Sequence, residues 1–484
     1  MTYLLLTKKT SEIFYVIDGQ QRLTSLLLLF NDWKITRNGE PIKIEVPISY
    51  NPSNKKLYKS ESRGINLSKL IKAFCLDDIE TLTELAQKIP KGTLEEMKEK
   101  IKRILEYPVP ICIMETFNEG EETFKSMAEA FIRVNKFGVR IGNLELMLSF
   151  LAGAISGELK NRIRNIYEDL YTSFEIDLQP IIRFIFSNFN LKQTQISKVE
   201  QFKSNITQIS KYQQNVIESI FNNSHIALRL VLKLLERELG ITNSQLLPSQ
   251  APLIPLAAYF YSRNIKSLDE VDNQDIQTMV NWFILTSFTG YYSSQTDTKL
   301  DRDLETIRNS ATIFPYQKLL DNMRAIRFKV KISFDDIKRG LHFNVLRLQG
   351  RSYLFLLYVL LVKKGADDWN GVLLHKRSIK DLAKHHIFPK DYLDENLNPE
   401  DPETKETLIN NLSNITFIHK DINAEIEDKS PEDYLPSYID CAQKHFIPSD
   451  KNLWKLEQYQ TFLEYRIRQI YSAAKELFAP IFEY

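Results

Sequence analysis

The first 150 residues alternate between strand-like and helix-like patterns. Short runs of β-branched and aromatic residues predict buried strands, and longer apolar segments with helical composition follow them. The strands are predicted at 13–17, 42–50 and 109–114, and the helices at 23–30, 121–134 and 144–151. This alternation predicts a mixed α/β region.

The pattern changes twice further along the chain. From about 155 to 350, long segments such as 216–239 and 276–288 carry apolar residues at helical spacing, which predicts an all-helical region. After an apolar helix at 353–362, the order becomes strand, loop, strand and short helix. We therefore expect three domains, at 1–152, 153–350 and 351–484.

Composition narrows the class of protein. The 484 residues are 43% hydrophobic and 26% charged, which is ordinary for a soluble globular chain. The 63 Lys and Arg against 62 Asp and Glu give a net charge of +1, so a DNA contact needs a local basic patch. Three distant cysteines argue against a disulfide framework or a cysteine-rich zinc site. With neither a membrane span nor a signal peptide in evidence, the sequence predicts a cytoplasmic protein that has no membrane partner.

A candidate anion site lies where the first predicted strand passes into a helix. The run Asp18-Gly19-Gln20-Gln21-Arg22 follows that strand directly. A helix N-terminus exposes unpaired N–H groups, Gly19 lets the backbone approach a phosphate, and Arg22 offers a bidentate fork. The same residues also fit a plain turn in which Asp18 caps the helix. Further on, Arg133 and Asn135 form a polar group that fits either a site or a helix C-cap.

Histidines gather near the C-terminus. Four of the seven lie between His385 and His445. A histidine is largely neutral near pH 7 and suits the role of general base in phosphodiester hydrolysis, which also needs a divalent cation and a group that orients the base. Neighbouring strand residues point to opposite faces, so His385 and His386 are expected to have different roles. Without other support, the pair also fits a strand that ends at Pro389.

Two pairs of motifs carry a resemblance to a known family. DGQQRLTS at 18–25 and FIRVNKFGVRIGNLEL at 131–146 resemble the GmrS-type domain, a relative of the ParB nucleotide-binding fold found in GmrSD-like modification-dependent restriction enzymes. The resemblance implies a nucleoside triphosphate site. Its residues are Asp18, Gly19, Gln20, Gln21, Arg22, Arg133 and Asn135. Family members carry a longer segment ahead of DGQQR, so this domain is expected to be N-terminally short.

The C-terminal motifs resemble the GmrD-type nuclease domain, an HNH or His-Me finger relative. They are HHIFPKDYL at 385–393 and LSNITFIHKDINAEIEDKSPEDYL at 412–435. By this resemblance His386 is the general base and Asn414 the orienting asparagine, while His385 and Asn423 lie on the metal side. Lys429 lies where a phosphate-contacting lysine is often seen, and His419 has no family role.

The resemblance implies an α+β multidomain protein. It combines an incomplete ParB-like α/β N-terminal domain, an all-α middle domain and a ββα-metal nuclease domain. The implied function is an NTP-regulated endonuclease that uses Mg²⁺ or a similar ion and cuts modified phage DNA. Two alternatives stay open: a nucleotide-binding sensor with a vestigial nuclease domain, and a toxin-like nuclease. Homo-oligomerisation is also left open.

Overall fold

The computed structural model describes most, but not all, of the chain. The described residues are 4–8, 14–18, 20–31, 34–37, 40–43, 48–52, 54–59, 64–75, 78–89, 91–106, 109, 111–114, 157–196, 205, 208–209, 211–310, 313–341, 348–397 and 407–483. The chain divides into two compact units, Met1–Gly142 and Asn143–Tyr484. The predicted helices at 121–134 and 144–151 lie outside the described residues.

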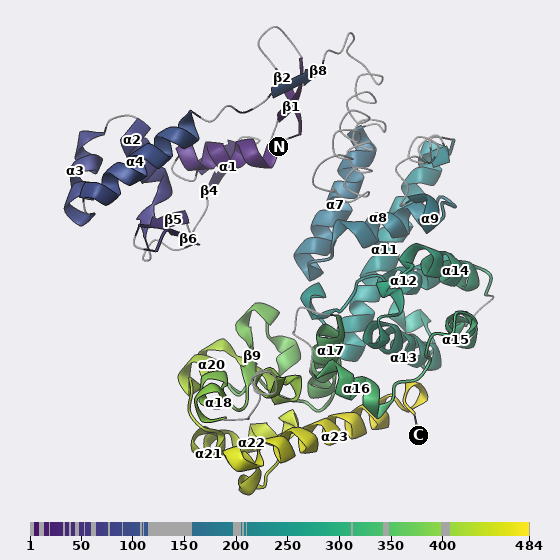
Figure 1. Cartoon of the computed structure of the whole chain (residues 1–484). Coiled ribbons are helices and arrows are strands. Elements are labelled where there is room, and N and C mark those ends of the chain that lie inside the picture. The colour runs from purple at the N-terminus through teal and green to yellow at the C-terminus, as the bar shows by residue number, and fades with distance from the viewer. Residues whose placement is uncertain are drawn as a thin grey trace. The chain divides into compact units, whose positions relative to one another are not determined.

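The described residues of the first unit form three small sheets (Figure 1). Its strands are β1 (Leu4–Lys8), β2 (Phe14–Asp18), β3 (Lys34–Arg37), β4 (Glu40–Lys43), β5 (Ile48–Asn51), β6 (Lys56–Lys59), β7 (Ile65–Asn66) and β8 (Ile111–Met114). In one sheet β1 lies between β2, which is antiparallel to it, and β8, which is parallel. The predicted strands at 13–17 and 109–114 are confirmed as β2 and β8, while the segment 42–50 contributes to two strands, β4 and β5.

The helices of the first unit form its described core. They are α1 (Gln20–Phe30), α2 (Leu67–Cys75), α3 (Ile79–Lys88) and α4 (Lys91–Leu105). Asp78 caps α3 by accepting from the Thr81 N–H group at 3.3 Å. Apolar residues of α2 to α4, among them Leu70, Leu85 and Met97, pack together and are buried. The predicted helix at 23–30 is confirmed as α1.

The second unit begins with a helical part. Its helices are α7 (Gly157–Phe174), α8 (Leu178–Ser187), α9 (Gln193–Ile196), α11 (Gln214–Leu239), α12 (Leu253–Ser262), α13 (Asn273–Thr289), α14 (Thr296–Arg308), α15 (Tyr316–Ala325) and α16 (Phe334–Gly340). The predicted helices at 216–239 and 276–288 are confirmed as α11 and α13. Within the described residues from 157 to 341 there is no paired strand, only an isolated bridge from Ile332 to Phe482.

The rest of the second unit carries one antiparallel strand pair among helices. Its elements are α17 (Leu348–Lys363), β9 (Leu382–His386), α18 (Lys390–Asn396), β10 (Ile415–His419), α20 (Lys420–Ile426), α21 (Pro431–Tyr434), α22 (Ile439–Ala442) and α23 (Tyr459–Leu477). The apolar α17 packs against α13 and α23, so it joins the two parts of the unit, and α23 (yellow in Figure 1) also contacts α16. In the described part of the chain, no helix is both long and apolar enough to cross a membrane.

Candidate active site at the β9–β10 hairpin

The histidine pair lies at the end of a strand in a β-strand, β-strand, helix arrangement. In the antiparallel register, His386 lies opposite Ile415, His385 opposite Thr416 and Lys384 opposite Phe417. Helix α20 follows β10 directly and packs on both strands. Side chains alternate along a strand, so one face carries His385 and the other carries Leu382, Lys384 and His386. The two imidazoles therefore leave the end of β9 on opposite sides.

Asn414 clamps the backbone that follows His386. Its side chain is fully buried, and its Nδ2 donates to the Phe388 carbonyl at 2.8 Å while its Oδ1 accepts from the Phe388 N–H at 2.9 Å. The Asn414 carbonyl also accepts from the Ile387 N–H at 2.8 Å. The Phe388 ring packs against Tyr459 and Phe462 of α23. The sequence places Asn414 as the orienting asparagine, and the structure joins it to the backbone next to His386 rather than to the imidazole.

His385 is buried and both of its ring nitrogens have partners. Its side chain is 2% exposed, with Nδ1 2.9 Å from Asn423 Oδ1 and Nε2 3.1 Å from the Tyr434 hydroxyl. Burial lowers the pKa of His385 to about 4, so the ring is neutral near pH 7. A neutral imidazole carries one hydrogen and one lone pair, and the neighbours decide which nitrogen has which.

The hydrogen bonds of Tyr434 determine which ring nitrogen of His385 carries the hydrogen. Its hydroxyl donates its only hydrogen to the Ile387 carbonyl at 2.6 Å, so the hydroxyl oxygen accepts from Nε2–H of His385. The Nδ1 lone pair of His385 then faces the Oδ1 acceptor of Asn423. Two acceptors at this distance cannot hydrogen-bond to each other. Either both of them ligate one cation, or the Asn423 amide is turned so that its nitrogen donates to Nδ1 of His385. No motif in the sequence pointed to a role for Tyr434.

His386 has a different environment. It is half-buried, and within the described residues its ring makes no hydrogen bond or ion pair. Burial lowers its pKa, and the positive charge of Lys390 lowers it further, so the ring is a neutral base near pH 7. A neutral imidazole with an unused lone pair can accept a proton.

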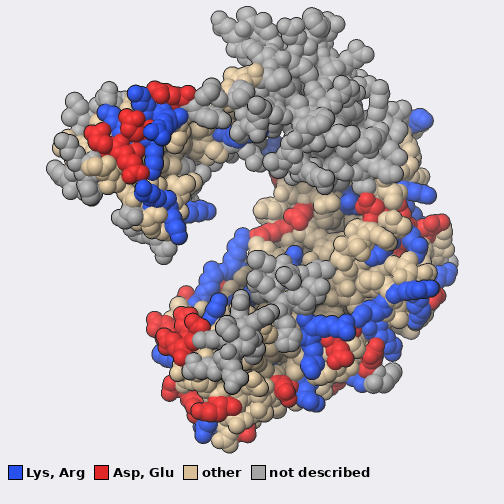
Figure 2. Space-filling view, viewed as in Figure 1, with Lys and Arg blue, Asp and Glu red and all other residues tan. Residues whose placement is uncertain are grey.

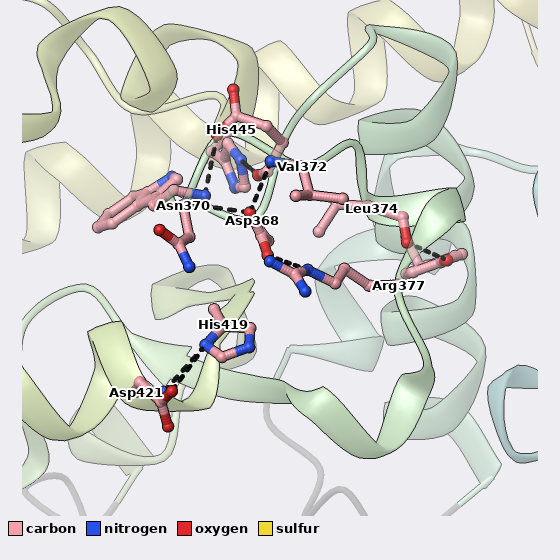
Figure 3. A network of polar contacts seen from close by, with 11 residues as sticks. Asp368, Asn370, Val372, Leu374, Arg377, His419, Asp421 and His445 are labelled. Atoms are coloured by element: carbon pink, nitrogen blue, oxygen red, sulfur yellow. Dashed lines mark hydrogen bonds and ion pairs between the residues drawn. The ribbon is translucent and has the colours of Figure 1, made fainter.

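A polar network supports the far end of β10 (Figure 3). The Asp368 carboxylate is fully buried and accepts from the Asn370 and Val372 N–H groups and from Arg377 Nε at 2.6 Å. The Asp368 carbonyl in turn accepts from the His419 N–H at 2.9 Å. His419 caps α20 through the Asp421 N–H group, which is a structural role.

His445 also serves the structure. It is fully buried between the Thr416 hydroxyl, 2.7 Å from Nδ1, and the Asp367 carbonyl, 2.8 Å from Nε2. Burial lowers the pKa of His445 to about 4. Two of the four clustered histidines, His419 and His445, are thus occupied by contacts that hold the hairpin in place.

The remaining candidates lie apart from this centre or outside the described residues. Lys429 is exposed and donates to the Glu425 carbonyl at 2.9 Å. Strand β2 ends at Asp18, helix α1 begins at Gln20, and the half-buried Arg22 lies in the first turn of α1. The structure does not describe the Asp18, Gln20 and Gln21 side chains, and Gly19, Arg133 and Asn135 lie outside the described residues.

Two comparisons bear on the identity of the chain. Residues 2–152 match the family model described as the GmrSD restriction endonuclease, N-terminal domain, and residues 332–472 match that described as the GmrSD restriction endonucleases, C-terminal domain. Together these matches cover more than half of the chain, and the second includes the whole β9–β10 hairpin. No curated protein matches the chain.

Proposed function

The chain belongs to the GmrSD restriction endonucleases, and from this premise we propose that the β9–β10 hairpin hydrolyses the DNA phosphodiester with His386 as general base. Restriction endonucleases cut DNA, so the enzyme is a DNA-cleaving hydrolase. The observation that carries the assignment is the state of His386, a neutral ring with an unused lone pair next to a clamped backbone. A ring nitrogen of His386 takes the proton from the attacking water.

We propose that His385 and Asn423 hold a divalent cation. Their facing acceptors lie 2.9 Å apart, so both would ligate the same ion. When bound, such an ion neutralises charge that develops on the phosphate. Tyr434 keeps the hydrogen of His385 on Nε2 and so leaves Nδ1 free to ligate.

By the family resemblance, we propose that the ion is Mg²⁺ or a similar one. Among the described residues, no group of three or more His, Cys, Asp and Glu side chains gathers as a metal site. Two protein donors suit Mg²⁺, which keeps several of its waters. The order β9, β10 and α20 supports the proposal that this region is of the ββα-metal, HNH or His-Me finger class, with Lys429 as a phosphate contact at its edge.

The N-terminal unit is proposed as the regulatory part. The strand-to-helix turn between β2 and α1 supports an NTP site, because a helix N-terminus and the Arg22 fork both favour phosphate. The full proposed set is Asp18, Gly19, Gln20, Gln21, Arg22, Arg133 and Asn135. By the family resemblance, the substrate is phage DNA with modified bases, and the NTP regulates its cleavage.

A cleavage panel tests this function. Plain, hydroxymethylated and glucosylated DNA are each incubated with the full chain, with and without Mg²⁺, chelator and each of the four NTPs. We expect cleavage of modified DNA that stops when chelator is added and changes with NTP. If no DNA is cut while an NTP still binds, the nuclease assignment is wrong and the sensor alternative is correct.

A further inference from the structure

A cavity of about 530 Å³ opens on the face of the hairpin that is turned away from His385. We call it the cationic pocket. It is lined by Gln245, Leu246, Leu247, Arg351, Leu354, Phe355, Ile379, Leu382, Lys384 and Phe417. These residues come from helix α17, the two strands, two short helical turns (Ser244–Leu246 and Ile379–Asp381) and Leu247, which follows the first turn. The size is that of a pocket for a small molecule or one unit of a polymer.

The charge of the cationic pocket has one sign. Among the described residues that line it, Arg351 and Lys384 are the charged ones and none is a carboxylate. Arg351 donates to the Leu247 carbonyl at 2.8 Å, which orients its guanidinium. Lys384 has no hydrogen bond or ion pair within the described residues, although Arg351 is close enough for their charges to repel. Two neighbouring cations without a counter-charge favour an anionic ligand.

The apolar lining adds a second requirement. Leu354, Phe355 and Phe417 are at most 5% exposed and form a rigid wall beside the two cations. A lone inorganic ion would leave this wall unused. A ligand that joins a phosphate to a less polar body, as a nucleotide does, satisfies both parts.

The cationic pocket is also aligned with the proposed base. Leu382 and Lys384 line it, and strand alternation places His386 on the same face, two residues along β9. That spacing is about 7 Å at the rise of a β-strand, so a chain of phosphates that passes His386 also reaches Lys384. A pocket that bound a free nucleotide would have no need to lie in line with His386.

We propose that the cationic pocket binds a nucleotide unit of the DNA strand that is cut, with its backbone phosphate between Lys384 and Arg351. The sugar and base rest against the wall formed by Leu354, Phe355 and Phe417. This inference rests on the proposed nuclease function and extends it, because it identifies the contacts that position the strand beside His386.

The test measures DNA binding separately from cleavage. Anisotropy titrations with a fluorescent duplex use the full chain carrying His386→Ala, across a series of salt concentrations. Lys384→Gln and Arg351→Gln, which remove charge at exposed positions, are added singly and together. Lys380→Gln is the matched control, since Lys380 lies near the pocket but pairs with Glu175 at 2.6 Å and does not line it.

We expect each pocket variant to weaken DNA binding about tenfold at 0.15 M salt and to lower the salt slope by about one, with the control unchanged. Unchanged DNA affinity and slope in the double variant overturn the inference, and the nuclease function stands if the parent with His386 still cuts. If the pocket variants lose ATP or dAMP binding while their DNA affinity is unchanged, the inference is also overturned, and the ligand of the pocket is a free nucleotide. If the intact parent cuts no DNA, the proposed function fails. The binding data alone then decide whether the cationic pocket binds DNA.

Discussion

Replacing Asn414 with alanine tests whether one buried amide holds the proposed base in place. The substitution removes both side-chain bonds to Phe388, whose side chain is fully buried. The Phe388 N–H and carbonyl then lose their partners, at about 1–3 kcal/mol for each buried group. We expect Asn414→Ala to lower the free energy of unfolding by about 2–6 kcal/mol, a large share of the usual 5–15.

The same change should slow DNA cleavage by more than the loss of folded protein explains. Phe388 is free to shift once the clamp is gone, while Ile387 is still held by the Asn414 carbonyl and the Tyr434 hydroxyl. Displacing a catalytic group by about 1 Å lowers the rate about 100-fold. Asn411→Ala is the control. Asn411 lies in the same turn and caps it through the Ser413 N–H and hydroxyl, so its loss destabilises the protein without touching Phe388.

The assay combines urea unfolding with single-turnover cleavage, at a temperature where both variants are folded. The expected result is a rate about 100-fold lower for Asn414→Ala and a rate near that of the parent for Asn411→Ala. If Asn414→Ala cuts at the parental rate per folded molecule, the clamp does not position His386 and the reasoning is refuted.

Three further predictions follow from other contacts. Tyr434→Phe removes the hydroxyl that fixes the hydrogen of His385, so Mn²⁺ affinity measured by electron paramagnetic resonance should fall about 10- to 100-fold, and unchanged affinity contradicts the role of Tyr434. Burial lowers the pKa of His445 to about 4, against about 6.5 in an unfolded chain, so the unfolded state binds more protons in between. The free energy of unfolding should therefore fall as the pH drops from 6.5 to 4, and equal urea midpoints at pH 7 and pH 4.5 would refute this. Arg22→Ala should weaken NTP binding by about 1.5–3 kcal/mol in calorimetry, whereas unchanged binding would remove Arg22 from the site.

Local patterns predicted the elements whose hydrophobic periodicity is visible within a few turns of the chain. The apolar periodicity of 216–239 became α11, and the apolar run at 353–362 lies within α17. The strand β1 was missed. Its apolar run is short and ends in lysines, and the strand pairs both with the nearby β2 and with β8, about 100 residues further along the chain. The second partner lies outside any short window of sequence.

The residues of the candidate site also fall into those that the sequence predicted and those that only the structure revealed. Residue types and motifs pointed to His385, Asn423 and Asn414, and the structure brings His385 and Asn423 together across 38 positions. The role of Tyr434 follows from which hydrogen-bond partner receives its single hydroxyl hydrogen. The role of Lys384 and Arg351 follows from the charges that line the cationic pocket. No sequence pattern reports either, so these residues emerged only from the fold.

The most direct test of the central claim is the single-turnover cleavage rate of His386→Ala beside His419→Ala, with Mg²⁺ in excess. Both variants remove an imidazole from the end of a hairpin strand, but His419 caps α20 and has no part in the proposed chemistry. The account predicts that His386→Ala cuts about 10²- to 10⁴-fold more slowly, with unfolding free energy changed by less than about 1 kcal/mol. It predicts that His419→Ala cuts at the parental rate while losing about 1 kcal/mol of stability with its cap. Equal cleavage by His386→Ala and the parent would show that His386 is not the base.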